Sequence, residues 1–117
     1  MFNYHIKNNK ELIFRMDTIT DFKWDYFIVL PPYTNVQELS NKINVDLNEL
    51  NETDIKHSDR INLLVFIKNN KLYKYTEYPR NPDFSRLNSE DFYPPEDAVF
   101  KMSKPDQPFD NYYIVKI

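Results

Sequence analysis

The stretch from Trp24 to Leu30 most constrains what this chain can fold into. It holds the one tryptophan of the chain and is apolar or aromatic from Tyr26 onward, with such side chains on both faces of an extended strand. That pattern is typical of an interior strand covered on two sides. Two prolines follow, and because proline cannot donate to a strand ladder, the strand ends there. Strict alternation assigns Trp24, Tyr26, Ile28 and Leu30 to one face and Asp25, Phe27 and Val29 to the other.

A helix is predicted directly after the two prolines, over about 34–43. Thr34 and Gln37 have the spacing of a capping box, in which the threonine hydroxyl accepts from a backbone amide and the glutamine side chain reaches back. Asn44 suits a left-handed stop to this helix. The polar segment 45–58 is expected to hold a second short helical piece. One helical face is shared by Val36, Leu39, Ser40 and Ile43.

Further short strands are predicted over residues 2–6, 12–16, 61–67, 72–78, 98–102 and 112–117. Residues 17–22 break the alternation and are expected to form a turn or one loose helical turn. The sequence Lys-Asn-Asn-Lys occurs at 7–10 and again at 68–71, each time between two of these strands. The chain contains no glycine, so asparagine is the residue best suited to positive φ. Both tetrapeptides are therefore predicted to form hairpin turns centred on their two asparagines.

Residues 79–95 are rich in proline, asparagine, aspartate and serine, which is typical of a long loop. Its aromatic residues Phe84, Phe92 and Tyr93 are expected to pin it to the body of the protein. At 117 residues the chain is expected to form one domain. Its fold class is predicted to be α+β: an antiparallel or mixed sheet of five to seven strands, with the main helix at about 34–43 packed on it and the proline-rich loop over one edge.

The charge balance argues against several kinds of partner. The formal net charge is −3, and lysine and arginine are spread along the chain, so the basic stripe that a nucleic-acid backbone requires is missing. No run approaches the roughly 20 apolar residues of a membrane span, and the first residues lack the apolar region of a signal peptide. As written, the chain is expected in the cytoplasm; the alternative is an exported or lipid-anchored protein whose signal segment has been removed.

No set of residues points to catalysis, to a cofactor or to a metal. There is no cysteine and no glycine, which excludes thiol chemistry and glycine-rich phosphate loops. His57-Ser58-Asp59 contains the residue types of a hydrolytic triad, but sequence neighbours rarely converge as a triad must, so a polar loop is expected. The two histidines, His5 and His57, do not have the spacing of metal ligands.

Carboxylates offer the one alternative route to an enzyme. Asp25 is charged and lies within the predicted central strand, where burying a carboxylate costs several kcal/mol unless it is paired. It is therefore expected to cap a nearby turn or to pair with Arg15 or Arg60. The acidic pairs at 90–91 and 96–97 are interpreted as solvated loop charge, with a hard cation such as Ca²⁺ as the alternative. A carboxylate-dependent enzyme of unknown substrate would use Asp25, Glu96 or Asp97.

One sequence motif resembles a known group of proteins. Trp24-Asp25, a short hydrophobic run and then Pro32-Tyr33-Thr34 are similar to a motif of small, uncharacterised bacterial proteins, many of which look like lipoproteins. The strand residues 63–66 and residues 97–100 are similar to that family as well, so the resemblance covers about 21–100. It implies an α+β fold, no assigned activity, and an envelope location as an alternative. This chain lacks the glycine before Pro-Tyr and a visible lipid-attachment signal. Trp24, Asp25, Tyr33 and Thr34 are the motif residues with a structural or functional role.

The sequence predicts a non-catalytic binding or interaction module, of an immunity, accessory or envelope-associated kind. Within 72–78, Tyr73 and Tyr75 alternate with polar residues, and Tyr78 lies on the other face, so this strand is not covered on both sides. An exposed edge with tyrosines is a place where a partner strand or a second copy adds, which makes Tyr73, Tyr75 and Tyr78 the candidate binding residues. Alternatively, the tyrosines complete the core and the 79–95 loop covers the edge.

Overall fold

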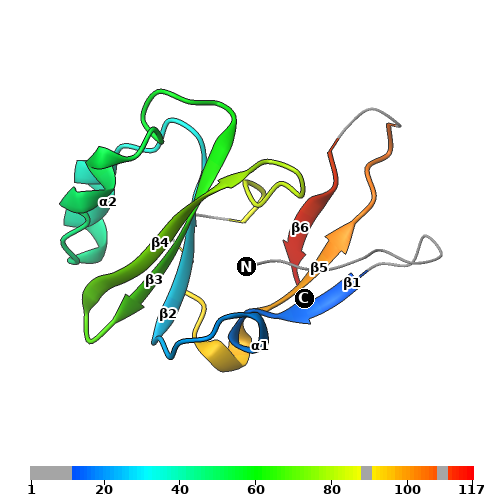
Figure 1. Cartoon of the computed structure of the whole chain (residues 1–117), viewed down its shortest axis with the longest axis horizontal. Helices are drawn as coiled ribbons and strands as arrows, with labels where there is room; N and C mark the ends of the chain where they lie inside the picture. The colour runs from blue at the N-terminus through cyan, green and yellow to red at the C-terminus, as the bar shows by residue number, and fades with distance from the viewer. Residues whose placement is uncertain (1–11, 88–90, 108–110) are drawn as a thin grey trace.

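Six strands form two antiparallel sheets in the computed structural model, which describes residues 12–87, 91–107 and 111–117 (Figure 1). One sheet has the order β1-β5-β6 and contains β1 (Leu12–Arg15), β5 (Val99–Ser103) and β6 (Tyr113–Lys116). The other has the order β2-β3-β4 and contains β2 (Tyr26–Leu30), β3 (Ile61–Lys68) and β4 (Lys71–Pro79). The helical pieces are α1 (Met16–Ile19), α2 (Val36–Ile43) and the 3₁₀ turns η1 (Asn48–Glu52) and η2 (Pro95–Asp97).

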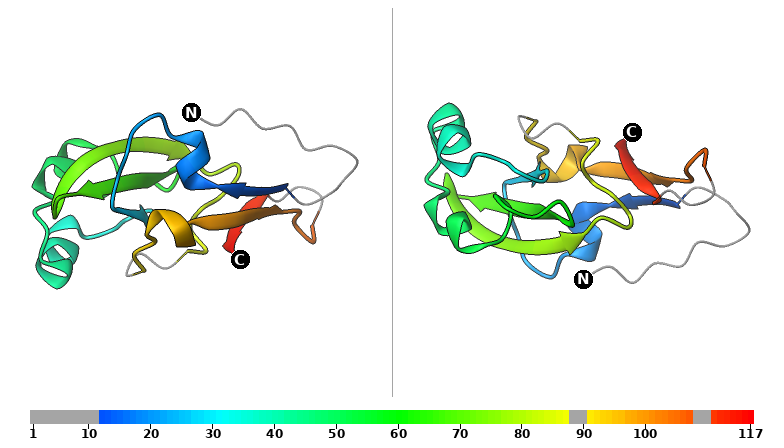
Figure 2. Two further views of the ribbon diagram at one scale, coloured as in Figure 1. Left: turned by 90° about the horizontal axis from the view of Figure 1, so that it is seen from below. Right: turned by 90° about the horizontal axis from the view of Figure 1, so that it is seen from above.

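The α+β class is confirmed, but the prediction of one sheet with five to seven strands is wrong. The reason lies in β2 and β3, whose residues are apolar on both faces and are almost all buried. Each face therefore needs its own cover. α2 and η1 cover one face of this sheet, and the β1–β5–β6 sheet covers the other, so that the β2–β3–β4 sheet is the middle layer (Figures 1 and 2). The single-domain prediction is in agreement with this arrangement.

Two hydrophobic cores follow from the three layers. The core on the α2 side joins Ile28, Leu30, Leu63, Val65 and Ile67 of the strands to Val36, Leu39, Val45, Leu47, Leu50 and Ile55. The core between the sheets is mainly aromatic and includes Phe14, Trp24, Phe27, Phe66, Phe84, Tyr93 and Phe100. The ring centroid of Phe27 lies 5.1 Å from that of Phe66 and 5.8 Å from that of Phe100, so rings from both sheets pack directly against one another.

Trp24 lies in the core between the sheets and not on the α2 face with Ile28, as alternation had assigned it. β2 begins only at Tyr26, so Trp24 is outside the ladder and free of its alternation. Its ring is 5.4 Å from that of Phe66, and its Nε1 donates to Thr20 Oγ1 at 3.0 Å. The side chain is 5% exposed, which fits a large aromatic whose polar atom has found a partner.

The main helix is confirmed, but its predicted capping box is wrong. α2 begins at Val36 with Asn35 as its N-cap, and Asn35 Oδ1 accepts from the Glu38 amide at 3.0 Å. The hydroxyl of Thr34 donates instead to the Pro31 carbonyl at 2.6 Å, so it closes the turn that follows β2. Asn44 ends the helix with φ 58°, as predicted.

The β3–β4 hairpin is confirmed together with its turn. Asn69 and Asn70 have φ of 54° and 61°, and Lys68 pairs with Lys71 across them. The 45–58 segment contains η1, and 17–22 lies partly in α1, both as expected. The predicted strand 2–6 and hairpin turn 7–10 lie outside the described residues.

The proline-rich loop covers an edge of the middle sheet, and that edge belongs to β2. Tyr93 and Phe27 exchange two backbone hydrogen bonds, of 2.9 and 3.0 Å, on the side of β2 away from β3. Phe84 and Tyr93 are buried in the core between the sheets, which pins the loop there. In the described part of the loop, the backbone pairing with the middle sheet is with β2.

Candidate functional site

β4 is the outermost strand of the middle sheet in the described part of the chain (Figure 1). The direction of its backbone groups follows from the other side of the sheet. Because Phe27 bonds Tyr93 outward, its partner Phe66 in β3 must point its amide and carbonyl toward β4, where it pairs with Lys74. Alternation then directs the amides and carbonyls of Tyr75 and Glu77 away from β3. Among the described residues these four groups form the open edge of the sheet, where the Glu77 carbonyl also accepts from the Thr76 hydroxyl at 3.3 Å.

Pro79 agrees with this assignment. It pairs with Ile61 at the end of β4, two residues beyond Glu77, and so its nitrogen also points outward. Proline is tolerated in a strand at such an edge position because no ladder hydrogen bond is lost there. The regular part of the open edge therefore runs from Lys74 to Tyr78, between a bulge at one end and the proline at the other.

A β-bulge changes how the three candidate tyrosines are arranged. Lys74 pairs with Phe66 but Leu72 pairs with Ile67, so Tyr73 is an extra residue without a partner in β3. Tyr75 consequently packs on the α2 side, whereas Tyr73 contacts Phe22 on the side of the other sheet. The prediction that Tyr73 and Tyr75 share a face is wrong, because a one-residue bulge reverses the alternation.

Of the three tyrosines, Tyr73 alone is well exposed, at 42%. Tyr75 and Tyr78 are half-buried; Tyr78 stacks edge-to-face on Phe84 with centroids 5.5 Å apart. Burial raises the pKa of both hydroxyls, and at Tyr75 the carboxylates of Glu49, Glu52 and Glu77 raise the pKa further. Tyr75 thus lies beside three acidic groups on the α2 face of the edge.

The other face of the edge carries a patch that we call the lysine–tyrosine patch: Phe22, Lys68, Tyr73 and Lys74. The Nζ of Lys68 lies 5.0 Å from the Tyr73 ring centroid and that of Lys74 lies 5.6 Å from it. The Phe22 ring is 5.9 Å from Tyr73 and 5.0 Å, edge-on, from the buried ring of Phe66. Two cation–π contacts hold both ammonium groups over one ring. In the described part of the chain, neither ammonium has an ion-pair partner.

The four motif residues have separate positions and do not form one site. Trp24 is a core residue and Thr34 closes a turn, as described above. Asp25 is exposed, just before β2, and its carboxylate accepts from the Asn69 amide at 2.8 Å; it therefore caps the β3–β4 turn, one of its two predicted structural roles. The strand position predicted for Asp25 is wrong, and Arg15 pairs with Asp17 instead. Tyr33 is 61% exposed and has φ 65°.

A polar network in the 79–95 loop was not predicted. Arg80 forms a salt bridge of 3.0 Å with Asp83, which also accepts from Asn62 Nδ2 at 2.9 Å and from the Ser85 hydroxyl at 2.9 Å. Burial works against ionisation of Asp83, but the hydrogen bonds from Arg80, Asn62 and Ser85 outweigh it and lower the pKa of its carboxyl. Asn62 Oδ1 is buried without a partner among the described residues. The signal for this network in the sequence was an arginine and an aspartate three residues apart, Arg80 and Asp83.

This network borders a pocket of about 410 Å³ lined by Asp83, Arg86, Pro105, Asp106, Gln107, Asn111 and Tyr113. The Arg86 guanidinium lies 3.7 Å from the Tyr113 ring centroid, and so one of the two cationic groups here is already stacked. The other, Arg80, is paired with Asp83. The network thus satisfies its own charges and connects the loop to β6, which is a structural role.

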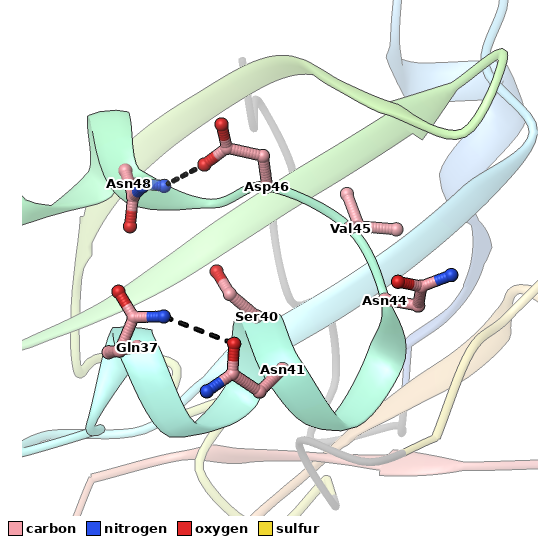
Figure 3. A pocket seen from close by; sticks show the side chains of 7 residues that line it. All are labelled: Gln37, Ser40, Asn41, Asn44, Val45, Asp46 and Asn48. Carbon is pink, nitrogen blue, oxygen red and sulfur yellow. Dashed lines mark hydrogen bonds between the residues drawn. The ribbon is translucent and has the colours of Figure 1, made fainter.

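A second polar pocket, of about 330 Å³, lies between α2 and η1 (Figure 3). Its side chains are short and uncharged except for Asp46, and two of them bond within the pocket wall: Gln37 donates to Asn41 at 3.1 Å, and Asp46 accepts from the Asn48 amide at 2.9 Å (Figure 3). The Ser40 hydroxyl accepts from the Leu47 amide at 2.8 Å. These bonds hold the turn between α2 and η1.

The other candidate carboxylates that the structure describes, and His57, lie on the surface. Glu96 and Asp97 are exposed in η2, and Asp91 is exposed nearby. The amide of His57 and the amide of Ser58 both donate to the Asp54 carbonyl, as in a polar turn. Among the residues that the structure describes, no group of three or more His, Cys, Asp or Glu side chains could hold a metal ion. Glu90 and His5 lie outside those residues.

Comparison with protein families, with curated proteins and with solved structures finds no match to this chain. The resemblance of the Trp24–Thr34 region to small bacterial proteins therefore stays a prediction. Within the described ranges, the structure has no helix that is both long and apolar enough to cross a membrane.

Proposed function

We propose that this protein is a non-catalytic binding module that takes up an extended segment of a partner protein along β4. The observation that carries this proposal is the open edge, where the outward amides and carbonyls of Tyr75 and Glu77 lie between the bulge at Tyr73 and Pro79. Backbone hydrogen bonds to an added strand supply affinity, and side chains on the two faces supply specificity. An immunity, accessory or envelope-associated role is compatible with such a module.

The difference between the two edge strands of the middle sheet, β2 and β4, supports the proposal. β2 has its outer side bonded to Tyr93 of the proline-rich loop, whereas β4 has nine residues and is the longest strand described. Proteins usually protect long edge strands against unwanted pairing with other strands. Here a bulge and a proline limit the regular part of the β4 edge to a short stretch. An edge shortened in this way but left open in its centre is suited to one short partner segment.

Peptide selection with one matched pair of variants tests the proposal. A library of random ten-residue peptides is selected on the wild-type protein, and the selected peptides are measured on Glu77→Pro and Glu77→Gln. Proline removes an outward amide and also the side-chain oxygen that accepts from the Asp54 amide at 2.9 Å, while glutamine removes the same charge and keeps both groups. We expect binding to be lost with Glu77→Pro and kept with Glu77→Gln, with circular dichroism showing that both are folded. Peptides that bind all three proteins equally would refute strand addition at β4.

Tyr75 is less suitable as a test residue than the sequence indicated. Because it packs on the α2-side core, replacing Tyr75 by lysine would disturb that core as well as the edge. Protection of the Tyr75 and Glu77 amides from hydrogen exchange on adding a selected peptide is a direct second measurement, since both amides are expected to be open in the free protein.

A further inference from the structure

We infer that the partner segment is acidic, with its carboxylates on the face of the added strand that meets the lysine–tyrosine patch. This inference rests on the proposed strand addition at β4 and specifies the chemistry of what is added. It starts from the charge of the two segments that contain the lysine–tyrosine patch. Residues 21–25 and 68–74 together hold four lysines and two aspartates, a net charge of +2, in a chain with a formal net charge of −3.

The two ammonium groups of the patch are placed to bind carboxylates. Lys68 and Lys74 are held over the Tyr73 ring, and in the described residues no carboxylate pairs with either of them. Of the two aspartates in the same region, Asp25 already accepts from the Asn69 amide. A strand next to β4 would bring its side chains on this face about 5 Å from those of Lys74, within reach of a lysine ammonium.

The ring of Phe22 strengthens the argument because it gives the patch a fixed base. It lies edge-on to the buried Phe66 ring and is itself half-buried, while Tyr73 packs on its outer side and Lys74 Nζ lies 5.9 Å from its centroid. The lysines are therefore ordered by aromatic contacts before a partner arrives. Ordering in advance reduces the entropy that binding must overcome.

A second copy of this chain fits the edge less well than an acidic segment. In a two-fold antiparallel pair of β4 strands, the same face of both copies lies on the same side of the joined sheet. If the pair were centred on Tyr75 or Thr76, Glu77 of one copy would lie across from or diagonal to Tyr75 of the other. Tyr75 is already beside Glu49, Glu52 and Glu77, so self-pairing gathers like charges on the α2 face.

The test uses two capped eight-residue peptides, one alternating glutamate with valine and one alternating the uncharged glutamine with valine. Alternation places all the charges of a bound peptide on one face. We expect the acidic peptide to bind at least tenfold more tightly than the uncharged one in fluorescence anisotropy, and its binding to weaken as salt is raised. The double variant Lys68→Gln/Lys74→Gln should lose about fivefold to tenfold in affinity for it. The matched control Lys104→Gln/Lys116→Gln removes two lysines at the β1–β5–β6 sheet, one just after β5 and one in β6, and should keep the wild-type affinity.

The other outcomes show whether this inference fails, the proposed function fails, or both fail. If both peptides bind equally, and both lose binding with Glu77→Pro but not with Glu77→Gln, strand addition stands and the acidic preference is wrong. If the acidic peptide binds Glu77→Pro as tightly as wild type, or still binds when all its amides are N-methylated, the lysines attract carboxylates without strand addition and both ideas are wrong. If neither peptide binds at millimolar concentration, the inference is wrong, and a dimer in sedimentation would assign the edge to a second copy.

Discussion

Positive φ in the described residues falls on three asparagines and on Tyr33. Asparagine tolerates the left-handed region, but a tyrosine there costs about 1–2 kcal/mol. In a chain without glycine the asparagines at 44, 69 and 70 are the expected solution, and Tyr33 is the exception. Its backbone amide donates to the Ile55 carbonyl at 2.8 Å, so the conformation is fixed by the connection between β2 and the loop after η1.

Tyr33→Asn is therefore expected to raise the free energy of unfolding by about 1 kcal/mol, because the side chain is largely exposed and little packing is lost. Urea denaturation measures it. Tyr26→Asn is the control: that tyrosine is also exposed but lies in β2 with ordinary strand geometry, so it should not gain stability. A loss at Tyr33 would show that its ring contributes more to folding than its backbone costs.

Trp24→Ala is expected to lower the free energy of unfolding by about 3–5 kcal/mol, the range for removing a large buried aromatic. Trp24 contacts rings of both β2 and β3 and also satisfies its Nε1 on Thr20. Trp24→Phe is the milder partner variant and should lose less. A cost below about 1 kcal/mol for alanine would contradict a core position.

The free energy of unfolding is expected to fall at alkaline pH because the Tyr93 hydroxyl is buried. Burial, followed by the charge and hydrogen bond of Asp91, raises the pKa of its hydroxyl to about 12 from the usual 10.0. A raised pKa means that the neutral form is favoured in the folded state, so this contribution is complete below pH 10 and is lost between pH 10 and about 12. The unfolding free energy of Tyr93→Phe should fall less steeply than that of wild type across this window. Equal slopes would contradict a raised pKa at this hydroxyl.

Among the elements, α2 shows where sequence reasoning succeeds and where it stops. Its apolar stripe and its stop at Asn44 follow from local periodicity and from the conformational preference of asparagine. Thr34 and Asn35 are adjacent and both are good N-cap residues, so local sequence does not decide between them. The Pro31 carbonyl decides, because it accepts the Thr34 hydroxyl and leaves Asn35 to cap.

Asn35→Ala is expected to cost about 1 kcal/mol in the free energy of unfolding, since it leaves the Glu38 amide without its side-chain partner. Asn35→Asp keeps the acceptor and adds a favourable charge at the helix start, so it should stay near neutral. Chemical denaturation compares the two. Equal losses from both variants would mean that the Asn35 side chain does not act as a cap.

At the scale of strands, the sequence predicted positions better than partners. The described strands begin or end within a few residues of the predicted runs, but pairing joins segments that are far apart, such as β1 with β5. Apolar residues on both faces of β2 indicated that each face packs against another layer, but they did not indicate that one of these layers is a second sheet. The bulge at Tyr73 leaves no trace in local composition, and it moved one of the three candidate tyrosines to the opposite face.

At the scale of the whole molecule, the three layers leave a long edge at β4 in the described part of the chain, and its two faces differ in charge. Lys68 and Lys74 are on the side of the β1–β5–β6 sheet, and Glu49, Glu52 and Glu77 surround Tyr75 on the α2 side. The glutamate group is not visible as a charge cluster in the sequence, because η1 and β4 come together only in the fold. Like charges placed across an edge are one way in which proteins prevent their own strands from pairing.

Replacing these three glutamates should therefore promote self-association. We expect wild type to be a monomer in sedimentation equilibrium at neutral pH, and Glu49→Gln/Glu52→Gln/Glu77→Gln to dimerise at least tenfold more tightly, because several like-charge contacts of about 0.2–1 kcal/mol each are removed from a two-fold pair. Glu38→Gln/Glu96→Gln/Asp97→Gln removes the same charge away from β4 and controls for net charge. Glu49→Gln/Glu52→Gln/Glu77→Pro removes the same three charges and also an outward amide of β4, so it should not dimerise more tightly than wild type. A dimer equally strong in both triple glutamine variants would show that net charge, and not the β4 edge, keeps the copies apart.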